Sequence, residues 1–214
     1  MSFRTFAAEA LADYKTTGAV APSSRYLVRA MLQPLVFEPG CIVVELGPGT
    51  GVMTSALLEA LPSASTLLAF EISDRFYGYL KRKFPDPRLV LLNTGAQYLE
   101  DELHKRGYER VDAIVSSLAL GFFSDADRRR LLQSLVSVMG DQSIFTQYQY
   151  MQGMEMQNGR VRRFSVRPLL EEYFDTVRCT TVWRNIPPAF VFACRKKESH
   201  NAHRPYVTQP GSKS

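Results

Sequence analysis

The chain has 214 residues, of which 45% are hydrophobic and 22% are charged, and its formal net charge is +5 at pH 7. Such a composition is that of an ordinary globular protein with one well-buried domain, and two full domains would be crowded in this length. No run approaches the roughly 20 apolar residues that span a bilayer, and Arg4 and Glu9 interrupt the apolar N-terminus where a signal peptide needs a continuous run. We therefore expect a cytoplasmic protein, whose mild basic excess is compatible with RNA or an anionic membrane surface as a partner.

The first residues of the chain predict an amphipathic helix. Aromatic and small apolar side chains recur there at helical spacing: Phe3, Phe6, Ala7, Ala10, Leu11 and Tyr14. Such a helix can lie flat in the headgroup region of a membrane, or its apolar stripe can simply pack on the domain. Because its polar face is not rich in Lys or Arg, the pattern alone does not choose between the two. We expect residues 1–23 to form this helix and a lid.

From residue 24 to residue 197 the pattern predicts one α/β domain. Apolar runs typical of buried strands stand at 41–47, 65–72, 88–93, 110–117 and 143–150. Amphipathic stretches typical of helices lie between them, at 52–61, 74–84, 97–106 and 125–139. This alternation indicates a mostly parallel sheet covered on both faces by helices. The inward-facing residues of the first and the last of these helices are predicted to be Val52, Ala56, Leu57 and Ala60, and Leu131, Leu132, Leu135 and Val138.

After the fifth predicted strand the pattern changes. A short helix over 167–173 precedes two strand-like runs at 176–184 and 189–195, and the "NIPP" between them indicates a hairpin turn rather than a helical crossover. The predicted fold is therefore a Rossmann-like, seven-stranded, mostly parallel α/β sheet that ends in an antiparallel hairpin. Residues 198–214 are polar, with Pro and Gly and almost no core-forming side chain, so we expect a disordered tail.

Three cysteines, Cys41, Cys179 and Cys194, stand in apolar or β-branched surroundings without a CxxC or Cys/His spacing. Buried thiols are therefore favoured over disulfides or a metal site, and we expect no metal.

The stretch "ELGPGTG", between the first predicted strand and its helix, contains Gly47, Gly49 and Gly51. Without Cβ atoms these residues let a ligand approach the backbone, and the following helix offers unpaired N–H groups. The spacing is neither the GxGxxG of dinucleotide-binding folds nor the GxxxxGK of phosphate loops. Glu45 beside the loop would repel a pyrophosphate but favour the cationic groups of S-adenosylmethionine, and Glu71, at the end of the next strand, suits the hydroxyls of a ribose. The alternative is a tight turn with incidental acids.

As a set, these motifs resemble those of the class I S-adenosylmethionine-dependent methyltransferases, over about residues 24–195. "ELGPGTG" is similar to their first motif, "FEIS" to their ribose-binding acid, and "VDAIVSS" to the strand whose end borders the reaction centre. The resemblance implies S-adenosylmethionine as the methyl donor and S-adenosylhomocysteine as the product. It also implies cofactor contacts from Glu45, Gly47, Gly49, Thr50, Gly51, Glu71, Ile72, Gly95, Ala96 and Ser116.

One element departs from the family pattern. After the third strand these enzymes usually carry an Asp or another polar side chain for the adenine amino group, but in "NTGAQ" Gly95 stands at this position. Adenine would then be held by backbone amides, by Asn93 or Gln97, or by apolar walls.

The methyl acceptor is not fixed by the fold, because one fold hosts many acceptors. Ribosomal RNA adenine dimethyltransferases are similar in the first motif, but they carry Asn-Leu-Pro-Tyr or a similar motif after the fourth strand, where this chain has "SSLALGFF". Nucleic acid is therefore disfavoured as a partner.

Three stretches, "TGAVAPSSRYLVRAM", "SSLALGFF" and "VWRNIPPAFVFACRK", together resemble the bacterial phospholipid N-methyltransferases, which convert phosphatidylethanolamine stepwise to phosphatidylcholine. The resemblance implies a membrane lipid as the acceptor and a peripheral position on the inner membrane. The alternatives are an ornithine lipid, which related enzymes methylate, rRNA adenine, a small-molecule amine, or cofactor binding without turnover.

Methyl transfer to an amine requires nitrogen, methyl carbon and sulfur in a line, and the amine must lose a proton to water or to a positioned group. The candidate catalytic residues are Tyr14, Ser116 and Tyr148. The tyrosines and Tyr150 can face the amine with oxygen or ring, or simply pack the strand ends. A catalytic histidine is disfavoured because the chain's histidines, His104, His200 and His203, fall outside the motifs.

Arginines are the candidate contacts for a lipid phosphate, because a guanidinium matches phosphate oxygens in a fork. The substrate site is predicted to contain Arg25, Arg163 and Arg184 beside Tyr14 and Tyr150, although each arginine taken alone is typical of an ordinary surface charge. The densest basic run, "RVRRFSVR" at 160–167, predicts either a membrane-facing patch or a solvated loop.

Overall fold

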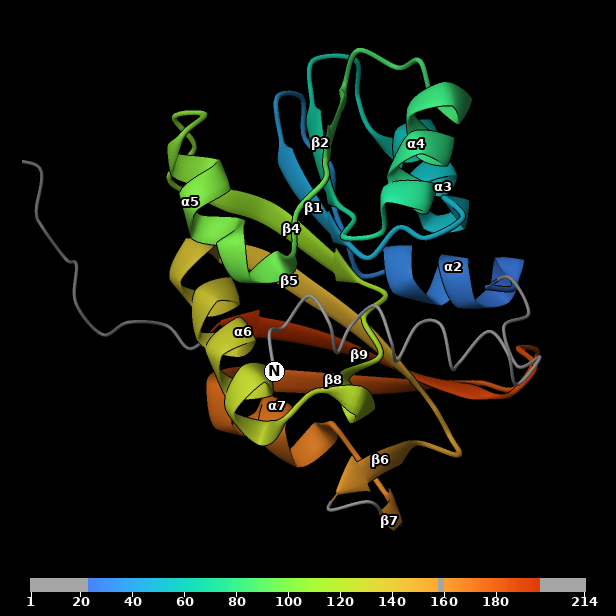
Figure 1. Ribbon diagram of the computed structural model, residues 1–214. Helices are drawn as coiled ribbons and strands as arrows, with labels where there is room; N and C mark the ends of the chain where they lie inside the picture. Colours follow the sequence, from blue (N-terminus) through green and yellow to red (C-terminus); the bar gives the residue numbers. More distant parts are fainter. Residues whose placement is uncertain (1–22, 158–159, 197–214) are drawn as a thin grey trace, which may run out of the picture.

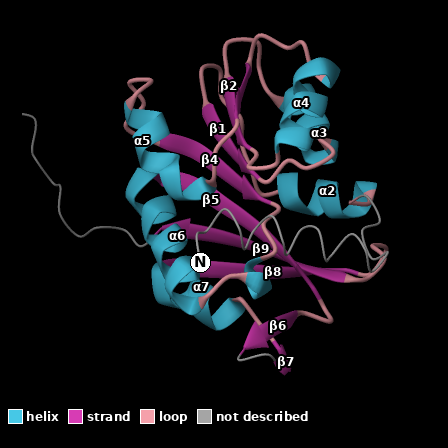
Figure 2. Cartoon of the chain, viewed as in Figure 1, coloured by secondary structure: helices cyan, strands magenta, loops and turns pink. Residues whose placement is uncertain are grey.

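The computed structural model describes residues 23–157 and 160–196, which form a twisted sheet with helices on both faces (Figures 1 and 2). The predicted N-terminal helix, including Tyr14, and the predicted tail at 198–214 lie outside the described residues, so these predictions and the domain boundaries drawn from them stay predictions. In the described part of the chain, no helix has the length and apolar content that crossing a membrane requires.

The main sheet has seven strands in the order β3-β2-β1-β4-β5-β9-β8. The strands are β1 (Ile42–Leu46), β2 (Thr66–Phe70), β3 (Leu89–Leu92), β4 (Val111–Ser116), β5 (Met139–Tyr150), β8 (Phe174–Val182) and β9 (Ala189–Lys196). The first five strands pair in parallel, and β9 is antiparallel to both of its neighbours, β5 and β8. The predicted mostly parallel sheet with an antiparallel terminal hairpin is confirmed. Strand order reverses between β1 and β4, and ligands of open α/β sheets bind at the carboxyl ends of the strands beside such a point.

Figure 1 shows that helices cover both faces of the sheet. On one face lie α2 (Arg25–Leu32), α3 (Val52–Ala60) and α4 (Asp74–Lys83); on the other lie α5 (Leu99–His104), α6 (Asp125–Val138) and α7 (Arg167–Tyr173). Each group of helices packs on a separate apolar core. There are two cores because successive strand residues point to opposite faces of the sheet: Val43 lies in one core and Val44 in the other. The inward face predicted for α6 is confirmed, since all four of its residues are buried.

Serine side chains begin three of the helices. The hydroxyls of Ser24, Ser73 and Ser124 accept hydrogen bonds from the backbone N–H three residues on, at the starts of α2, α4 and α6. A cap of this kind stabilises a helix by about 1 kcal/mol. Helix α4 starts at the carboxyl edge of the sheet because it follows β2, and α2 starts there because the Ser24 N–H donates to Asn185 in the turn between β8 and β9.

Three local predictions are wrong. Helix α3 buries Leu57 as predicted, but it also buries Met53 and Leu58, while Val52 and Ala56 are only half-buried and Ala60 is exposed. Most of "VMTSALLEA" is apolar, so its periodicity does not define one face. Cys179 is exposed, since β8 is the edge strand of the sheet, whereas the other two thiols are buried as predicted.

The third difference is a small second sheet. Strands β6 (Met154–Gln157) and β7 (Arg160–Arg163) pair as an antiparallel hairpin, so the basic run at 160–167 begins as a strand rather than as a loop. The charged residues of this run have a low strand propensity, so the sequence did not predict strand β7. Helix α2 was likewise not predicted.

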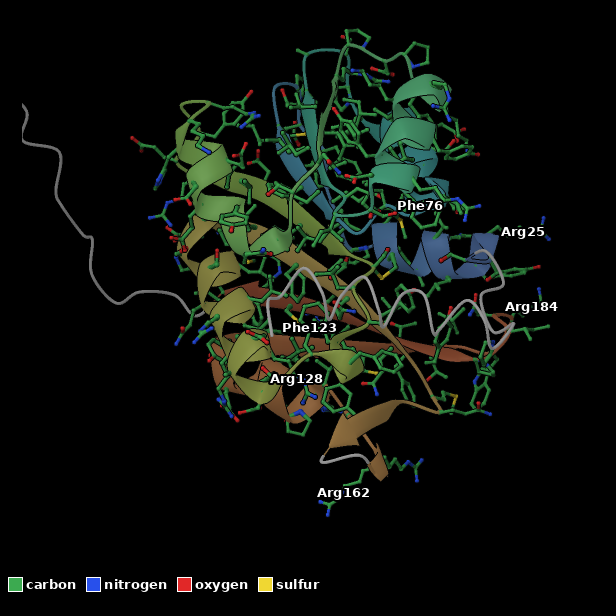
Figure 3. All side chains as sticks on the ribbon, viewed as in Figure 1. Arg25, Phe76, Phe123, Arg128, Arg162 and Arg184 are labelled. Carbon is green, nitrogen blue, oxygen red and sulfur yellow. The ribbon has the colours of Figure 1, made fainter. Side chains whose placement is uncertain are left out.

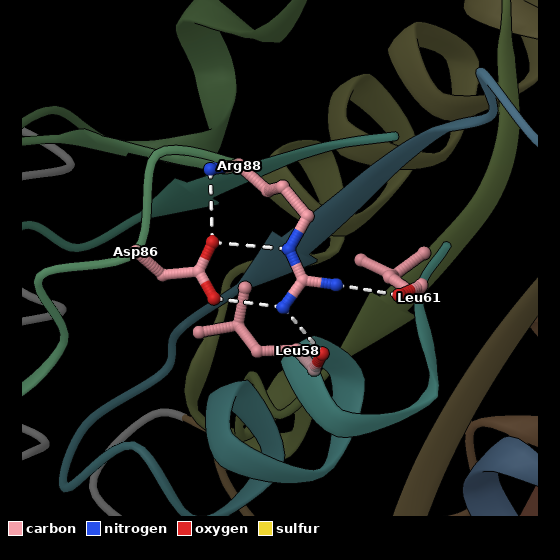
Figure 4. A network of polar contacts seen from close by, with 4 residues as sticks. All are labelled: Leu58, Leu61, Asp86 and Arg88. Carbon is pink, nitrogen blue, oxygen red and sulfur yellow. Dashed lines mark hydrogen bonds and ion pairs between the residues drawn. The ribbon is translucent and has the colours of Figure 1, made fainter. Parts of the chain in front are cut away.

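An arginine fixes the end of α3 (Figure 4). Arg88 donates hydrogen bonds to the backbone carbonyls of Leu58 and Leu61, which the helix itself leaves unpaired, and it forms an ion pair with Asp86 at 2.7 Å. The Arg88 guanidinium lowers the pKa of the Asp86 carboxyl by hydrogen bonding. This network ties α3 to the start of β3.

Candidate active site

The glycine loop has left-handed backbone at its three glycines: φ is 74° at Gly47, 56° at Gly49 and 77° at Gly51. At Gly51 a Cβ atom would lie 2.5 Å from the ring of Phe84 and 2.6 Å from Leu80, so the protein itself requires glycine there. At Gly49, by contrast, a Cβ atom would meet nothing within 4 Å. Gly49 therefore borders open space, as a residue against which a ligand packs should.

Glu71 ties this loop to the start of α4. One carboxylate oxygen accepts a hydrogen bond from the Gly49 N–H and the other from the Ser73 N–H, both at 2.9 Å, and the residue is 3% exposed. The Asn93 amide donates to the Glu71 carbonyl at 3.1 Å. Glu71 thus ties the Gly49 loop to the start of α4, and its place at the end of β2 is the one where an acid suits the hydroxyls of a ribose.

Glu45 lies under the loop with no exposed surface. One carboxyl oxygen accepts from the Thr54 hydroxyl at 2.8 Å, while the other is buried without a hydrogen-bond partner. Burial raises the pKa of Glu45 to about 8, and the nearby charge of Glu71 adds to this, whereas the Thr54 bond opposes it. A buried carboxyl with an unpaired oxygen fits a cationic ligand group, because such a group would both pair the oxygen and favour the ionised form.

Ser116 stands at the carboxyl end of β4, between Leu46 of β1 and Gln147 of β5. It is fully buried, and its hydroxyl accepts from the Leu118 N–H at 3.3 Å. The serine thus shapes the turn out of β4 at the strand-order reversal. Its predicted place beside the glycine loop follows from this register, since Leu46 leads directly into Gly47.

Gln147 is a polar residue that the sequence analysis missed. It is 1% exposed, and its side-chain nitrogen donates to the backbone carbonyls of Leu118 and Tyr148, at 3.0 and 2.6 Å. Its side-chain oxygen is buried without a hydrogen-bond partner. The sequence signal was available, because Gln147 stands directly before Tyr148, a residue already nominated for the site, near the carboxyl end of β5.

At the predicted adenine position, Gln97 folds back over Gly95. A Cβ atom on Gly95 would collide with the Gln97 side-chain oxygen, and this oxygen is buried without a partner. Ala96, also buried, begins the short turn η1 (Ala96–Tyr98). Of the two amides that the sequence offered for adenine, Asn93 is thus engaged with Glu71 through its nitrogen, whereas Gln97 has an acceptor left.

The remaining cofactor candidates lie at the loop rim. Thr50 is exposed and its carbonyl accepts from the Lys83 ammonium at 3.0 Å, and Ile72 is half-buried directly after Glu71. The structure therefore gathers the predicted cofactor residues at one edge of the sheet, around the ends of β1, β2, β3 and β4.

The predicted substrate residues fall into separate places. Tyr148 and Tyr150 form an edge-to-face ring pair at 5.4 Å at the end of β5. Arg25 and Arg184 both contact Tyr26 and lie at one end of the molecule (Figure 3). Arg163 belongs to the β6–β7 hairpin, away from that pair (Figure 1). Within residues 23–157 and 160–196, no metal-ligating side chains gather in a group of three.

Comparison with known proteins agrees with this geometry. Residues 43–142, from β1 into β5, match a family model described as a methyltransferase domain. The ornithine lipid N-methyltransferase of Singulisphaera acidiphila is 28% identical over 83% of this chain and 87% of that protein. The ribosomal RNA small subunit methyltransferase A of Prosthecochloris aestuarii is 34% identical, but over 37% of this chain and 30% of that protein.

Among solved structures, the 1,6-didemethyltoxoflavin-N1-methyltransferase of Burkholderia thailandensis, with S-adenosylhomocysteine bound, superposes with a TM-score of 0.65. The match covers 89% of this chain and 87% of that one, at 16% identity. This similarity confirms the predicted Rossmann-like fold.

Proposed function

We propose that this chain, a class I S-adenosylmethionine-dependent methyltransferase, methylates the amine of a membrane lipid. The main support is the share of each chain that aligns with its relative. The lipid-modifying relative aligns with most of both chains, whereas the RNA-modifying relative aligns with about a third of each. A shared cofactor motif explains the shorter alignment, but only a shared domain explains the longer one.

Two headgroups fit this class of acceptor. The "NIPPA" turn and "SSLALGFF" support phosphatidylethanolamine, through the resemblance to phospholipid N-methyltransferases. The relative from Singulisphaera acidiphila supports an ornithine lipid. Both present an amine that is a cation in water, so either must lose a proton before it can attack a methyl group.

The chain's own residues support the cofactor half of the reaction. S-Adenosylmethionine supplies the methyl group on a positively charged sulfur. The buried Glu45 carboxylate would balance its ammonium group, Gly49 leaves space beside the loop, and Glu71 stands at the end of β2, where an acid suits the hydroxyls of a ribose.

On the acceptor side, Tyr148 and Tyr150 stand at the end of β5, next to the strand that carries Ser116. Their ring faces can hold a methylated ammonium by cation–π attraction, which is worth about 0.5–2 kcal/mol and grows as water leaves. Holding the nitrogen in line with the methyl carbon is the main contribution that the protein makes.

Expression in a host fed with labelled methionine, followed by thin-layer chromatography of its lipids, tests the proposal. We expect labelled N-methylated lipid from the parent protein and none from Gly49→Val, whose side chain would fill the space beside the loop. Lipids that stay unlabelled while ribosomal RNA gains label would contradict the proposal. In reconstituted vesicles, phosphatidylethanolamine and ornithine lipid offered separately decide between the headgroups.

A further inference from the structure

The turn between β8 and β9 exposes two large apolar side chains. Trp183 is 69% exposed and Ile186 is 81% exposed, the highest value among the large apolar residues in the described part of the chain. Single exposed apolar residues are common, but two in one short turn, one of them a tryptophan, form a patch that water solvates poorly. Such a patch indicates a surface that binds an apolar partner, either another protein or a membrane.

This turn is held rigidly. Between the two apolar residues, Asn185 is 2% exposed, donates to the Pro187 carbonyl at 2.7 Å and accepts from the Ser24 N–H at 3.1 Å. On the other side, the Met151 N–H donates to the Pro188 carbonyl at 2.9 Å. The turn is thereby fastened to the start of α2 and to the end of β5, so Trp183 and Ile186 are held outward.

Two arginines flank the same turn. The guanidinium groups of Arg25 and Arg184 donate to the Tyr26 hydroxyl at 2.9 and 3.4 Å, and they lie 4.9 and 5.3 Å from the centre of its ring. In Figure 3 both side chains point away from the body of the protein. Neither has a carboxylate within ion-pair distance among the described residues, so the two positive charges are not neutralised there.

The turn lies at the edge of the sheet where the cofactor site is. Strand β8 ends at Val182, and Ala189 pairs with Tyr150 at the carboxyl end of β5. Gly47 and Ser116 stand at the carboxyl ends of β1 and β4, which run parallel to β5. A surface that met this turn would therefore lie beside the reaction edge rather than behind the sheet.

We propose that Trp183, Ile186, Tyr26, Arg25 and Arg184 form a docking patch for an anionic lipid bilayer. Trp183 and Ile186 enter the interface, where amphipathic and apolar side chains are stable, and the two arginines contact phosphates of the surrounding anionic lipids. The charge of the patch favours an anionic membrane over an apolar protein partner, because its rim carries two cations that pair with no acid among residues 23–157 and 160–196. The purpose of docking rests on the proposed function, since it brings the reaction edge to an acceptor that stays in the bilayer.

The chain has one tryptophan, so the full-length protein carries its own probe at position 183. On mixing with phosphatidylglycerol-containing vesicles, we expect the tryptophan emission to shift to the blue, with quenching by lipids brominated on the acyl chains. Vesicles of phosphatidylcholine alone should give a much smaller shift, and added salt should reverse it. A protein that floats with the vesicles while its emission keeps the wavelength of a water-exposed tryptophan would overturn the proposal, as would absence of binding.

Variants separate the apolar and the charged parts. Replacing both arginines, R25Q with R184Q, should weaken partition to anionic vesicles about 30-fold, and Ile186→Ser should weaken it on vesicles of any charge. The matched controls are Val36→Ser, an exposed apolar residue before β1, and Arg195→Gln, an exposed arginine near the opposite edge. Controls that weaken binding as much as the patch variants would show that the surface is not specific.

The same samples distinguish this proposal from the proposed function. A tryptophan shift on vesicles that gain no methylated lipid would support docking and contradict lipid methylation. Methylated vesicle lipid without a tryptophan shift, and with parental activity in Ile186→Ser, would support the enzyme and overturn the patch.

Discussion

The proposed cofactor half of the reaction edge, and the docking patch beside it, which we take as the acceptor half, are built in different ways. In the cofactor half, contacts join residues close in sequence: Thr54 reaches Glu45 across 9 positions, and Gly49 reaches Glu71 across 22. In the acceptor half, Arg184 reaches Tyr26 across 158 positions, and Asn185 reaches Ser24 across 161. The cofactor half is thus one folded motif of buried polar groups and backbone, whereas the acceptor half is assembled from the two ends of the domain and lies largely at the surface. This difference explains why the first half can be predicted from local sequence motifs, whereas the second cannot.

The strongest way to break the cofactor half is to give the loop a side chain that it cannot hold. Gly51→Val places a β-branched residue at a left-handed backbone position and against Phe84, and we expect a loss of about 4 kcal/mol in the free energy of unfolding. Gly107→Val is the matched control, because its φ is 75° but its Cβ would meet nothing within 4 Å. Urea unfolding measures both; equal losses would mean that only the backbone, and not the packing behind the loop, requires glycine at position 51.

Removing the Glu71 carboxylate should affect ligand affinity more than stability. Glu71→Ala deletes the acceptors for the Gly49 and Ser73 N–H groups and for a bound ribose, and each charge-assisted bond contributes about 1.5–3 kcal/mol. We expect S-adenosylmethionine to bind at least about 10-fold more weakly by titration calorimetry. Asp86→Ala is the control, since it removes a carboxylate that joins elements outside the site (Figure 4). Parental affinity in Glu71→Ala would place the ribose elsewhere.

The raised pKa of Glu45 predicts a pH-dependent stability. Its folded pKa of about 8 lies above the ordinary 4.5, so the folded state binds this proton more tightly than the unfolded state does. Between these two values stability should therefore fall as the pH rises, by up to about 1.4 kcal/mol per pH unit. Glu45→Gln, which keeps an acceptor for Thr54, should flatten this slope in urea unfolding between about pH 5 and pH 8. The same variant should bind S-adenosylmethionine more weakly, most of all at high pH; a slope and an affinity like those of the parent would show that the carboxyl is not the charged group of the site.

A smaller effect on stability is expected from Arg88, which only supports the end of α3. Arg88→Ala should reduce the free energy of unfolding by about 1–2 kcal/mol, because two carbonyls at the end of the helix lose their donor. Arg167→Ala, which removes an exposed pair with Glu171 within one helix, should cost less than about 0.5 kcal/mol. The urea midpoints of unfolding of the two variants measure this difference, and the midpoint of Arg88→Ala should be the lower one. Equal midpoints would show that Arg88 contributes no more to stability than a surface arginine.

The sequence separation of the contacting residues, short in the cofactor half and long in the acceptor half, also decides which parts of the site the sequence can predict. The seven strands of the main sheet, the helices from α3 to α7 and the residues Glu45, Gly47, Gly49, Gly51 and Glu71 follow from hydrophobic period and from local motifs, so the sequence alone could place them. The unpaired oxygens of Gln97 and Gln147 could not be foreseen, because whether a buried amide has a partner depends on its neighbours in space. The same holds for Tyr26, whose two arginine neighbours come from distant parts of the chain.

Strand β7 and the exposed Cys179 show a different limit. Both depend on the position of a strand within its sheet, as a separate hairpin or as an edge, and the periodicity of the segment does not report that position. For the same reason the arginines could be nominated for a lipid phosphate but not grouped. Only the structure separates Arg163 on its hairpin from Arg25 and Arg184 beside the β8–β9 turn.

The central claim is that the acceptor is a lipid amine, and one competition tests it directly. Purified protein is given labelled S-adenosylmethionine together with mixed vesicles containing phosphatidylethanolamine and ornithine lipid, and with ribosomal subunits in the same tube, and the label is followed into each fraction. Our account predicts label in the organic phase, on a lipid that co-migrates with an N-methylated standard, and no label there with Gly49→Val. Label that enters the ribosomal RNA while the lipids stay unmodified would contradict it.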